Sequence, residues 1–390
     1  MAIELRGVSW DHPRGHDCMV ATSTAWAELR RDVHITWHTR SLQAFGDFPI
    51  QKLAETYDLL VIDHPFVGFA ADDGCLLPLD TVLSTEFLAE QAANSVGPSH
   101  RSYVYGGHQW GLATDAAGHV SAYRPDLIAE IGGLPQSWEE VLALAERRKG
   151  HERAQVINPL IPIDAIMSVL SLCAAAGEPA YQQDDRMVSR SVGRQVLGML
   201  RALASTAHPE SLKRNPPRSL DLMSSTDEVA FIPLLFGYSN YGRPGFRDHL
   251  VRFTGVPTIG GGEPRGGVLG GAGVAISSHT QHPMEAAEFA AFVASPDVQR
   301  GVYFTGGGQP GHRVAWLDEA VNAASSDFFR DTLANLDNAY LRPRFHGFME
   351  CQEDSGKLVH QWLVEGTDSA DWLLDRLDAV YQESAPAGKE

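Results

Sequence analysis

The segment from Gly266 to Arg313 constrains the fold of this chain more than any other. Its first part, GGVLGGAGVAIS, predicts an apolar strand whose glycine pairs let another backbone or a ligand approach closely, because glycine has no Cβ. Pro283 then opens an apolar run with helical spacing, and the pair Ser295-Pro296 ends that run. A second glycine turn follows at 306–308. The pattern predicts a segment that passes between two lobes.

The N-terminal part predicts a β-α-β unit. The runs IELRGVSW (3–10) and DVHITWH (32–38) have the pattern of short strands, and the run between them has helical spacing. A third strand is predicted in YDLLVIDHP (57–65), because a continuous apolar run bounded by turn residues is typical of a strand covered on both faces. The first lobe is therefore predicted to be α/β with a parallel sheet.

The acidic composition favours a small molecule over a polyanion as the partner. The chain has 390 residues, enough for two or three domains, and its 31 Lys and Arg against 49 Asp and Glu leave a net charge of -18. Such a charge repels nucleic acid and anionic membrane surfaces. No apolar stretch reaches the roughly 18 residues that a membrane span needs. The sequence predicts a soluble globular protein with no nucleic-acid partner.

The N-terminus, MAIELRGVSW, does not read as a secretory signal. Glu4 and Arg6 are charged, and neither an apolar core nor a small-residue cleavage site follows. Either a leader has been removed or none exists.

The four cysteines are Cys18, Cys75, Cys173 and Cys351. They lie far apart and match no zinc or redox spacing. We predict free, mostly buried thiols, with one disulfide as the open alternative.

Four motifs follow one another between residues 105 and 140. In the last of them Ser137 is a good helix N-cap, and Glu140 lies three residues on for a capping box. The motifs are a Tyr105-Gly106 turn, a strand at Gly111–Asp115, a Tyr-x-x-Asp-Leu segment at Tyr123–Leu127 and the helix start Pro135–Glu140. With the glycine-rich segment, their order resembles the solute-binding proteins of ABC importers, particularly the sugar-binding group.

The resemblance implies a two-lobed α/β fold of the periplasmic-binding-protein type II. Each lobe is then a mixed sheet flanked by helices, with the ligand cleft between the lobes. The family's chain path places residues 1–113 and 269–309 in the first lobe and residues 114–268 and 310–390 in the second, with crossings near 114, 268 and 309. Several crossing strands make a hinge about which rigid lobes close on a ligand.

A repeated tripeptide supplies the leading site candidates. Asp11-His12-Pro13 follows the first predicted strand, and Asp63-His64-Pro65 follows the third. Because ligands bind beyond the carboxyl ends of strands in an open parallel sheet, both tripeptides are expected to face the cleft. Trp10, Phe66 and the forked cation of Arg14 accompany them as predicted ligand contacts.

These residues also have structural interpretations. The aspartates are typical caps of nearby backbone amides, and each proline is a typical end of a strand. For the two histidines we expect hydrogen bonds to ligand, with ordinary packing and metal binding as alternatives. The sequence has neither the short helical ligand spacing nor the glutamate base of a metallohydrolase, so we predict no metal and no cofactor.

The resemblance adds candidates elsewhere in the chain. Asp115 belongs to a strand that lines the cleft in the family, and its alternative role is a bond to backbone. Phe236 and Tyr238 occupy an aromatic turn where sugar binders stack rings on pyranoses, with core packing as the alternative. Arg344 and His346 lie in a C-terminal loop that faces the cleft in the family, with surface salt bridging as the equal alternative. Gln309 is a candidate on its own sequence context, because it follows the second glycine turn, whose amides are expected to face an oxygen-rich ligand.

The predicted function is capture of a small polar solute by closure of the lobes, as a monomer outside the cytoplasm, for delivery to an ABC permease. The ligand is expected to be a carbohydrate or a similar compound; an acidic one stays open, because His and Arg recur among the candidates. One alternative is a cytoplasmic enzyme on the same fold that uses the Asp-His pairs as acid and base. Another is a soluble ligand sensor. No nucleophile elbow, phosphate loop or dinucleotide fingerprint supports an enzyme.

Overall fold

The computed structural model describes residues 2–41, 49–183 and 185–384. The chain divides into two compact units, and each is described by itself. Unit 1 comprises Met1–Ala117, Gly270–Asn322 and Arg344–His346, and unit 2 comprises Gly118–Leu269, Ala323–Pro343 and Gly347–Glu390.

Residues 310–322 belong to unit 1, whereas the sequence predicted them in the second lobe. After Gln309 the chain turns back onto unit 1, because the amide of Gly311 donates to the carbonyl of Thr114 at 3.0 Å and the amide of Arg313 donates to that of Asn94 at 2.8 Å. In this division the chain leaves unit 1 after Asn322, and the lobe boundaries and crossings near 114, 268 and 309 stay a prediction.

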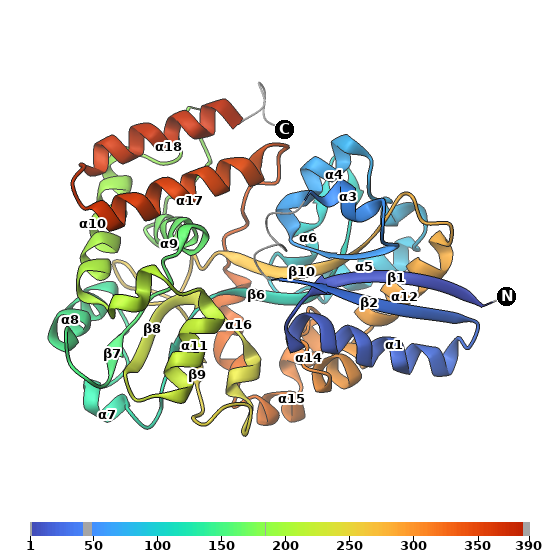
Figure 1. The fold of residues 1–390 in the computed structure, drawn as a ribbon, viewed down its shortest axis with the longest axis horizontal. Helices are drawn as coiled ribbons and strands as arrows, with labels where there is room; N and C mark the ends of the chain where they lie inside the picture. Colours follow the sequence, from blue (N-terminus) through green and yellow to red (C-terminus); the bar gives the residue numbers. More distant parts are fainter. Residues whose placement is uncertain (1, 42–48, 184, 385–390) are drawn as a thin grey trace. The chain divides into compact units, whose positions relative to one another are not determined.

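Unit 1 is built on a sheet whose predicted first three strands are confirmed (Figure 1). Its strands are β1 (Ile3–Trp10), β2 (Val33–Arg40), β3 (Leu59–Ile62), β10 (Leu269–Ile276), the first part of β6 (Leu112–Tyr123) and a separate hairpin of β4 (Val104–Tyr105) and β5 (His108–Gln109). The order is β2-β1-β3-β10-β6. β1 pairs in parallel with both β2 and β3, and β10 is antiparallel to β3.

Helices cover both faces of this sheet. α1 (Cys18–Leu29) and α12 (Pro283–Ala294) lie on one side, and α3 (Ile50–Ala54) and α4 (Val67–Asp73) on the other (Figure 1). Between the first pair and the sheet, the Phe289 ring lies 6.1 Å from that of Trp26 and 6.2 Å from that of Trp37, forming an aromatic core. The remaining helical segments are η1 (Pro13–Asp17), η2 (His64–Phe66), η3 (Leu79–Thr81), α5 (Thr85–Ala93), α6 (Ser99–Ser102), α13 (Pro296–Val298), η6 (Gln299–Tyr303), α14 (Arg313–Leu317) and α15 (Glu319–Ala324).

The glycine-rich strand β10 meets β6 at Gly271 within unit 1. Gly271 has a φ of +95°, and a Cβ there would lie 2.3 Å from the carbonyl oxygen of Asp115. Only glycine therefore fits both the backbone conformation and the close approach that the sequence predicted for this segment.

Unit 2 has a smaller sheet around the second part of β6. Its other strands are β7 (Gln155–Val156), β8 (Val229–Phe236) and β9 (Arg252–Thr254). β6 is antiparallel to β8, with His119 opposite Phe236, and also to β9, while β7 runs parallel to β8. The predicted strand before the aromatic turn is thus confirmed as β8.

The buried helix α9 (Pro162–Ala175) organises the rest of unit 2. It packs on α17 (Phe348–Glu365), where a Cβ on Gly356 would lie 2.6 Å from the carbonyl oxygen of Pro162. The predicted pair of C-terminal helices is confirmed as α17 and α18 (Ala370–Ser384), and Ser369 Oγ accepts from the amide of Trp372 at 3.1 Å. The other helices are α7 (Ile128–Ile131), α8 (Trp138–Arg148), α10 (Arg190–Thr206), η4 (Pro209–Leu212), α11 (Pro216–Ser225), η5 (Ser239–Gly242) and α16 (Phe328–Asp337).

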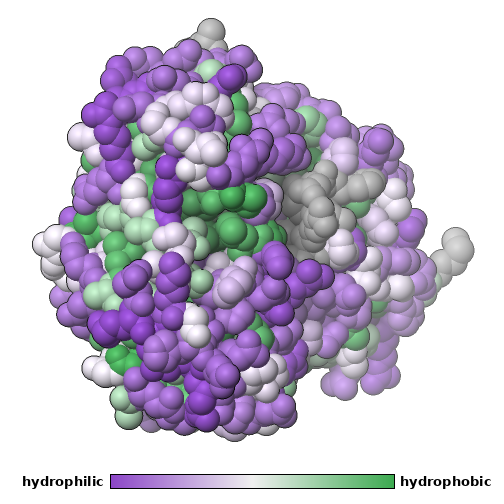
Figure 2. Space-filling view, turned by 60° about the vertical axis from the view of Figure 1, so that its left-hand side comes forward, coloured by the Kyte–Doolittle hydropathy of each residue, from purple (hydrophilic) through white to green (hydrophobic). Residues whose placement is uncertain are grey.

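The surface is largely hydrophilic on the face that Figure 2 shows, with a group of hydrophobic residues near its centre. Among the described residues, no helix combines the length and the apolar character that a membrane span requires. All four cysteines are buried free thiols, as predicted.

Candidate functional site

Both Asp-His-Pro turns leave the same edge of the unit 1 sheet. β1 ends at Trp10 and β3 ends at Ile62, and the two strands are parallel neighbours. The residues that follow them, Asp11 and Asp63, therefore emerge at the carboxyl ends of adjacent strands, where open α/β sheets bind their ligands.

The first turn is held by its own polar groups. His12 Nδ1 accepts from the amide of Arg14 at 3.0 Å and so caps the short helix η1, and Ser9 Oγ donates to the carbonyl of Gly15 at 2.8 Å. Asp11 is exposed and His12 is half-buried, but Trp10 is only 5% exposed. A Cβ on Gly15 would lie 2.3 Å from the Trp10 ring, which accordingly packs beneath the turn.

Arg14 and Asp115, which the sequence proposed as separate ligand contacts, bind each other. Arg14 Nε donates to Asp115 Oδ2 at 2.7 Å, and Arg14 Nη2 donates to Asp115 Oδ1 at 2.6 Å. Burial raises the pKa of the Asp115 carboxyl, and the Arg14 guanidinium opposes that rise. The fork of Arg14 is thereby committed to a protein carboxylate.

The second turn buries its histidine. Asp63 Oδ1 accepts from the amide of His64 at 2.8 Å and lies 3.1 Å from His64 Nδ1. His64 has no exposed surface, and its ring meets the ring of Tyr103 edge-on at 6.3 Å. Phe66 is also buried, at 8% exposed. Asp63 is the partly exposed member of this turn.

Three further candidates in unit 1 make bonds within the protein. Gln309 Nε2 donates to the carbonyl of Ala116 at 2.9 Å. Arg344 Nη1 donates to the carbonyls of Arg101, at 2.8 Å, and Val104. His346 Nδ1 lies 2.9 Å from Asp72 Oδ2 at the surface. Gln309 and Arg344 thus connect separate segments of the chain through backbone carbonyls, and their contact with ligand stays a prediction.

The two candidates of unit 2 lie at the end of β8. Phe236 is half-buried, with its ring edge-on to that of His119 at 4.5 Å, and Tyr238 is 6% exposed. His119 Nδ1 lies 2.8 Å from Ser171 Oγ, which also accepts from the amide of Val268 at 3.0 Å. Burial lowers the pKa of His119 to about 3, so its ring is neutral.

Three polar residues that lie at the ends of strands or in the interior were not singled out in the sequence. One is His119, and the only feature that could have indicated it is a histidine inside an apolar strand. Arg40 ends β2 at the same sheet edge as Asp11, whose amide donates to the Arg40 carbonyl at 2.8 Å, and burial lowers the Arg40 pKa to about 10. Asp164, in the first turn of α9, is 4% exposed. The feature of the sequence that could have indicated Asp164 is an acidic residue soon after Pro162 in an otherwise apolar run.

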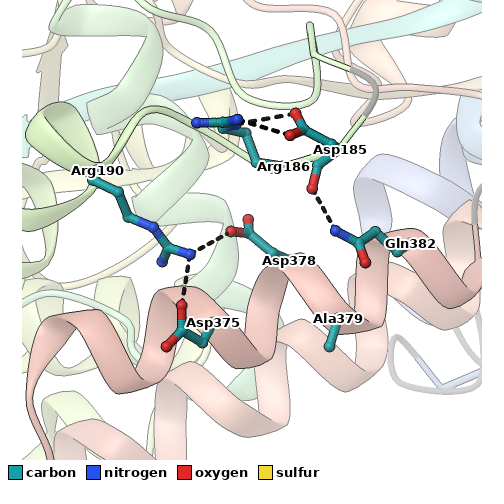
Figure 3. Close-up of a pocket in the computed structure, with 7 residues that line it drawn as sticks. All are labelled: Asp185, Arg186, Arg190, Asp375, Asp378, Ala379 and Gln382. Carbon is teal, nitrogen blue, oxygen red and sulfur yellow. Dashed lines mark hydrogen bonds and ion pairs between the residues drawn. The ribbon is translucent and has the colours of Figure 1, made fainter.

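A pocket of about 350 Å³ in unit 2 has a different character. Figure 3 shows Arg190 of α10 reaching Asp375 and Asp378 of α18, with distances of 2.6 and 3.0 Å, and Arg186 paired with Asp185 at 2.7 Å. The lining residues are Asp185, Arg186, Arg190, Asp375, Asp378, Ala379 and Gln382. Because its ion pairs join α10 to α18, we interpret this pocket as part of the scaffold.

Neither this pocket nor a second one of about 600 Å³ near His151 and His208 contains a predicted site residue. Within the described ranges, no group of three or more His, Cys, Asp or Glu side chains is arranged to hold a metal ion.

Comparisons with known proteins agree with this architecture. The sequence model of a family described as "bacterial extracellular solute-binding protein" matches residues 50–324, more than half of the chain. No curated protein matches.

Solved structures resemble the whole chain. The maltose-bound MalE3 of T. maritima has a TM-score of 0.84 at 15% identity, covering 98% of this chain and 100% of its own. An ABC transporter solute-binding protein of Agrobacterium radiobacter K84 in complex with ribitol has a TM-score of 0.81 at 18% identity, covering 98% of each chain. One of Agrobacterium vitis S4 with bound D-mannitol has 0.76 at 15%, with 98% of each chain covered. These TM-scores show that the chains share a two-lobed fold, although their sequence identities are low.

Proposed function

Because this chain belongs to the bacterial extracellular solute-binding protein family, we propose that it captures a carbohydrate or polyol and delivers it to the transmembrane permease of an ABC importer. The proposal includes an extracytoplasmic location and action as a monomer without a catalytic step. The ligands named for the similar structures, maltose, ribitol and mannitol, support a polyhydroxylated solute.

The observation that carries the proposal is the shared edge of the unit 1 sheet. Asp11 and Asp63 follow parallel neighbouring strands, and neither carboxylate is fully buried. A carboxylate accepts hydrogen bonds from the hydroxyl groups that dominate a sugar surface, and charge-assisted bonds of this kind are strong. His12, half-buried beside Asp11, adds a ring nitrogen that can donate or accept.

In unit 2, Phe236 is the candidate for an aromatic contact with the solute. Its half-buried ring ends β8, and an aromatic face suits the apolar face of a sugar ring. We propose it as a stacking residue. Closure of the units on the solute stays a prediction, to be checked by comparing small-angle scattering with and without ligand.

A thermal-shift screen of the purified chain against neutral sugars and polyols tests the function. A bound solute stabilises the native state, so a true ligand raises the melting temperature in a concentration-dependent way, and calorimetry then gives its affinity. Recovery of the ligand unchanged after long incubation is expected for a binding protein. Conversion of the ligand would favour the enzyme, and a screen without any carbohydrate or polyol hit would refute the proposal.

A further inference from the structure

Phe236 and His119 form an aromatic pair in the sheet of unit 2. The two residues lie opposite each other on β8 and β6, and their ring centroids are 4.5 Å apart at an interplanar angle of 62°. His119 is 1% exposed, whereas Phe236 is half-buried. A buried histidine ring therefore packs against a phenylalanine ring that keeps part of its surface accessible.

The backbone at the end of β8 is fixed, so rotation of the Phe236 side chain is the freedom that remains. The amide of Gly237 donates to the carbonyl of Gly118 at 3.2 Å. A Cβ on Gly237 would lie 2.8 Å from Val120 Cγ2, so the chain is closely packed there. Rotation about the side-chain bonds of Phe236 would move its ring against the ring of His119. The orientation of one ring therefore depends on that of the other.

His119 is held in place by both its side chain and its backbone. His119 Nδ1 lies 2.8 Å from Ser171 Oγ in the buried part of α9, and Ser171 Oγ also accepts from the amide of Val268 at 3.0 Å. The amide of His119 donates to the carbonyl of Val268 at 2.9 Å, and its carbonyl accepts from Asn335 Nδ2 at 2.8 Å. Ser171 is thus the polar anchor of the His119 ring.

The bond between His119 and Ser171 joins two uncharged groups. Burial, and to a smaller extent the Arg342 cation, lowers the pKa of His119 to about 3, so the ring is neutral. A buried neutral polar group is stable when it is paired. Removing the hydroxyl group in Ser171→Ala leaves His119 Nδ1 without this partner, and the ring is then free to change its orientation.

We propose that His119 is a positioning residue that, through its bond to Ser171, holds the Phe236 ring in the orientation that stacks on a ring-shaped sugar. The inference rests on the proposed function, in which Phe236 is the stacking residue. A ring that is oriented in advance loses less conformational entropy when the solute binds, so the affinity is higher than with a freely rotating ring. A linear polyol has no ring face to stack and gains little from this orientation.

Matched pairs of ring sugars and linear alcohols test the positioning. Glucose, galactose and xylose are compared with sorbitol, galactitol and xylitol by calorimetry on the full chain. Wild type is expected to bind at least one sugar more tightly than its alcohol, and Ser171→Ala should weaken the affinity for that sugar about fivefold. His119→Asn keeps a polar side chain near Ser171 but has no aromatic ring, and it should weaken the affinity by a similar factor. Circular dichroism should show both variants folded.

A double-mutant cycle separates positioning from a general effect on the fold. In the Phe236→Leu background, Ser171→Ala should change the affinity for the same sugar by less than about twofold, because no aromatic ring is left to orient. Ser224→Ala is the matched control, since Ser224 is a buried serine of unit 2 whose hydroxyl donates to the carbonyl of Leu220 at 2.7 Å, within its own helix. It should bind the sugar as wild type does.

Three results would overturn the inference and leave the proposed function standing. An equal loss of affinity in both backgrounds would show that Ser171 acts on the fold and not through Phe236. An unchanged sugar affinity in Ser171→Ala would show that the ring needs no anchor. Wild type that binds the alcohols at least as tightly as the sugars would show that no ring face is stacked. Absence of binding by all the sugars and alcohols would instead count against the proposed function.

Discussion

Arg14 and Asp115 form a buried, two-bond ion pair that joins the turn after β1 to β6 within unit 1. The two residues are 101 positions apart. The amide of the same Arg14 donates to His12 Nδ1, so the pair also orients the turn that presents His12 and Asp11. We interpret the pair as a support for the binding edge.

Removing one partner of this pair should strongly destabilise the fold. Both side chains are at most 5% exposed, so Asp115→Asn leaves the Arg14 charge buried and unbalanced, and a loss of about 3 kcal/mol in the free energy of unfolding is expected. Urea unfolding measures it. Arg330→Ala, which breaks the exposed pair of Arg330 with Asp327, should cost below about 1 kcal/mol. Equal effects of the two changes would show that the buried pair is dispensable.

His12→Asn separates capping from ligand binding. The asparagine side-chain oxygen can still accept from the amide of Arg14, so the melting temperature should stay near that of wild type. The ring nitrogen Nε2 is lost, and affinity for the solute found in the screen should fall about tenfold. His16→Asn, in the same turn, should bind as wild type does. An unchanged affinity for His12→Asn would remove His12 from the binding edge.

His64→Ala should lower the stability of the protein, and not only its affinity for the solute. The ring is fully buried against Tyr103, so its removal leaves a cavity in unit 1, and a loss of about 2–4 kcal/mol is expected in chemical unfolding. A variant as stable as wild type would mean that the ring contributes no packing.

Gly271→Ala tests the close approach of β10 to β6. The new Cβ would meet the carbonyl oxygen of Asp115 and would also have to adopt a positive φ, so a loss of about 3 kcal/mol or more is expected. Gly74→Ala is the matched control: its φ is +74°, but nothing lies within 4 Å of the new Cβ, and it should cost only about 1 kcal/mol. Similar losses would show that the strand contact has room to adjust.

Asp164 should make the stability of the free protein fall as pH rises. Its pKa is about 8 in the folded chain against 3.8 as the ordinary value, so between these values the unfolded chain ionises while the folded one stays protonated. Relative to Asp164→Asn, wild type should lose up to about 1.4 kcal/mol per pH unit in this window. Unfolding of both proteins from pH 5 to 8 checks this. A stability difference that is constant with pH would contradict the burial of a lone carboxyl group.

Much of the local structure follows from the sequence. The apolar runs become β1, β2, β3 and β8, and Ser137 caps α8 by accepting from the amide of Glu140 at 3.3 Å. Glu140 Oε2 in turn accepts from the amide of Gln136 at 2.7 Å, one residue before the position that a capping box predicts. Strand periodicity, helix caps and prolines act over a few residues, so the local sequence is enough to predict these strands and helix ends.

The sequence by itself determined the α/β elements, the placing of two Asp-His-Pro turns after parallel strands, and the family that their order resembles. Only the tertiary structure decided that Arg14 is bound to Asp115, that His64 is buried while Asp63 is not, that residues 310–322 return to unit 1, and that Asp164 stands alone. The physical reason is that the bonding partner and the burial of a side chain depend on segments far away in the sequence, about a hundred residues for Arg14 and Asp115. The spacing of neighbouring residues does not show which distant segments will pack together.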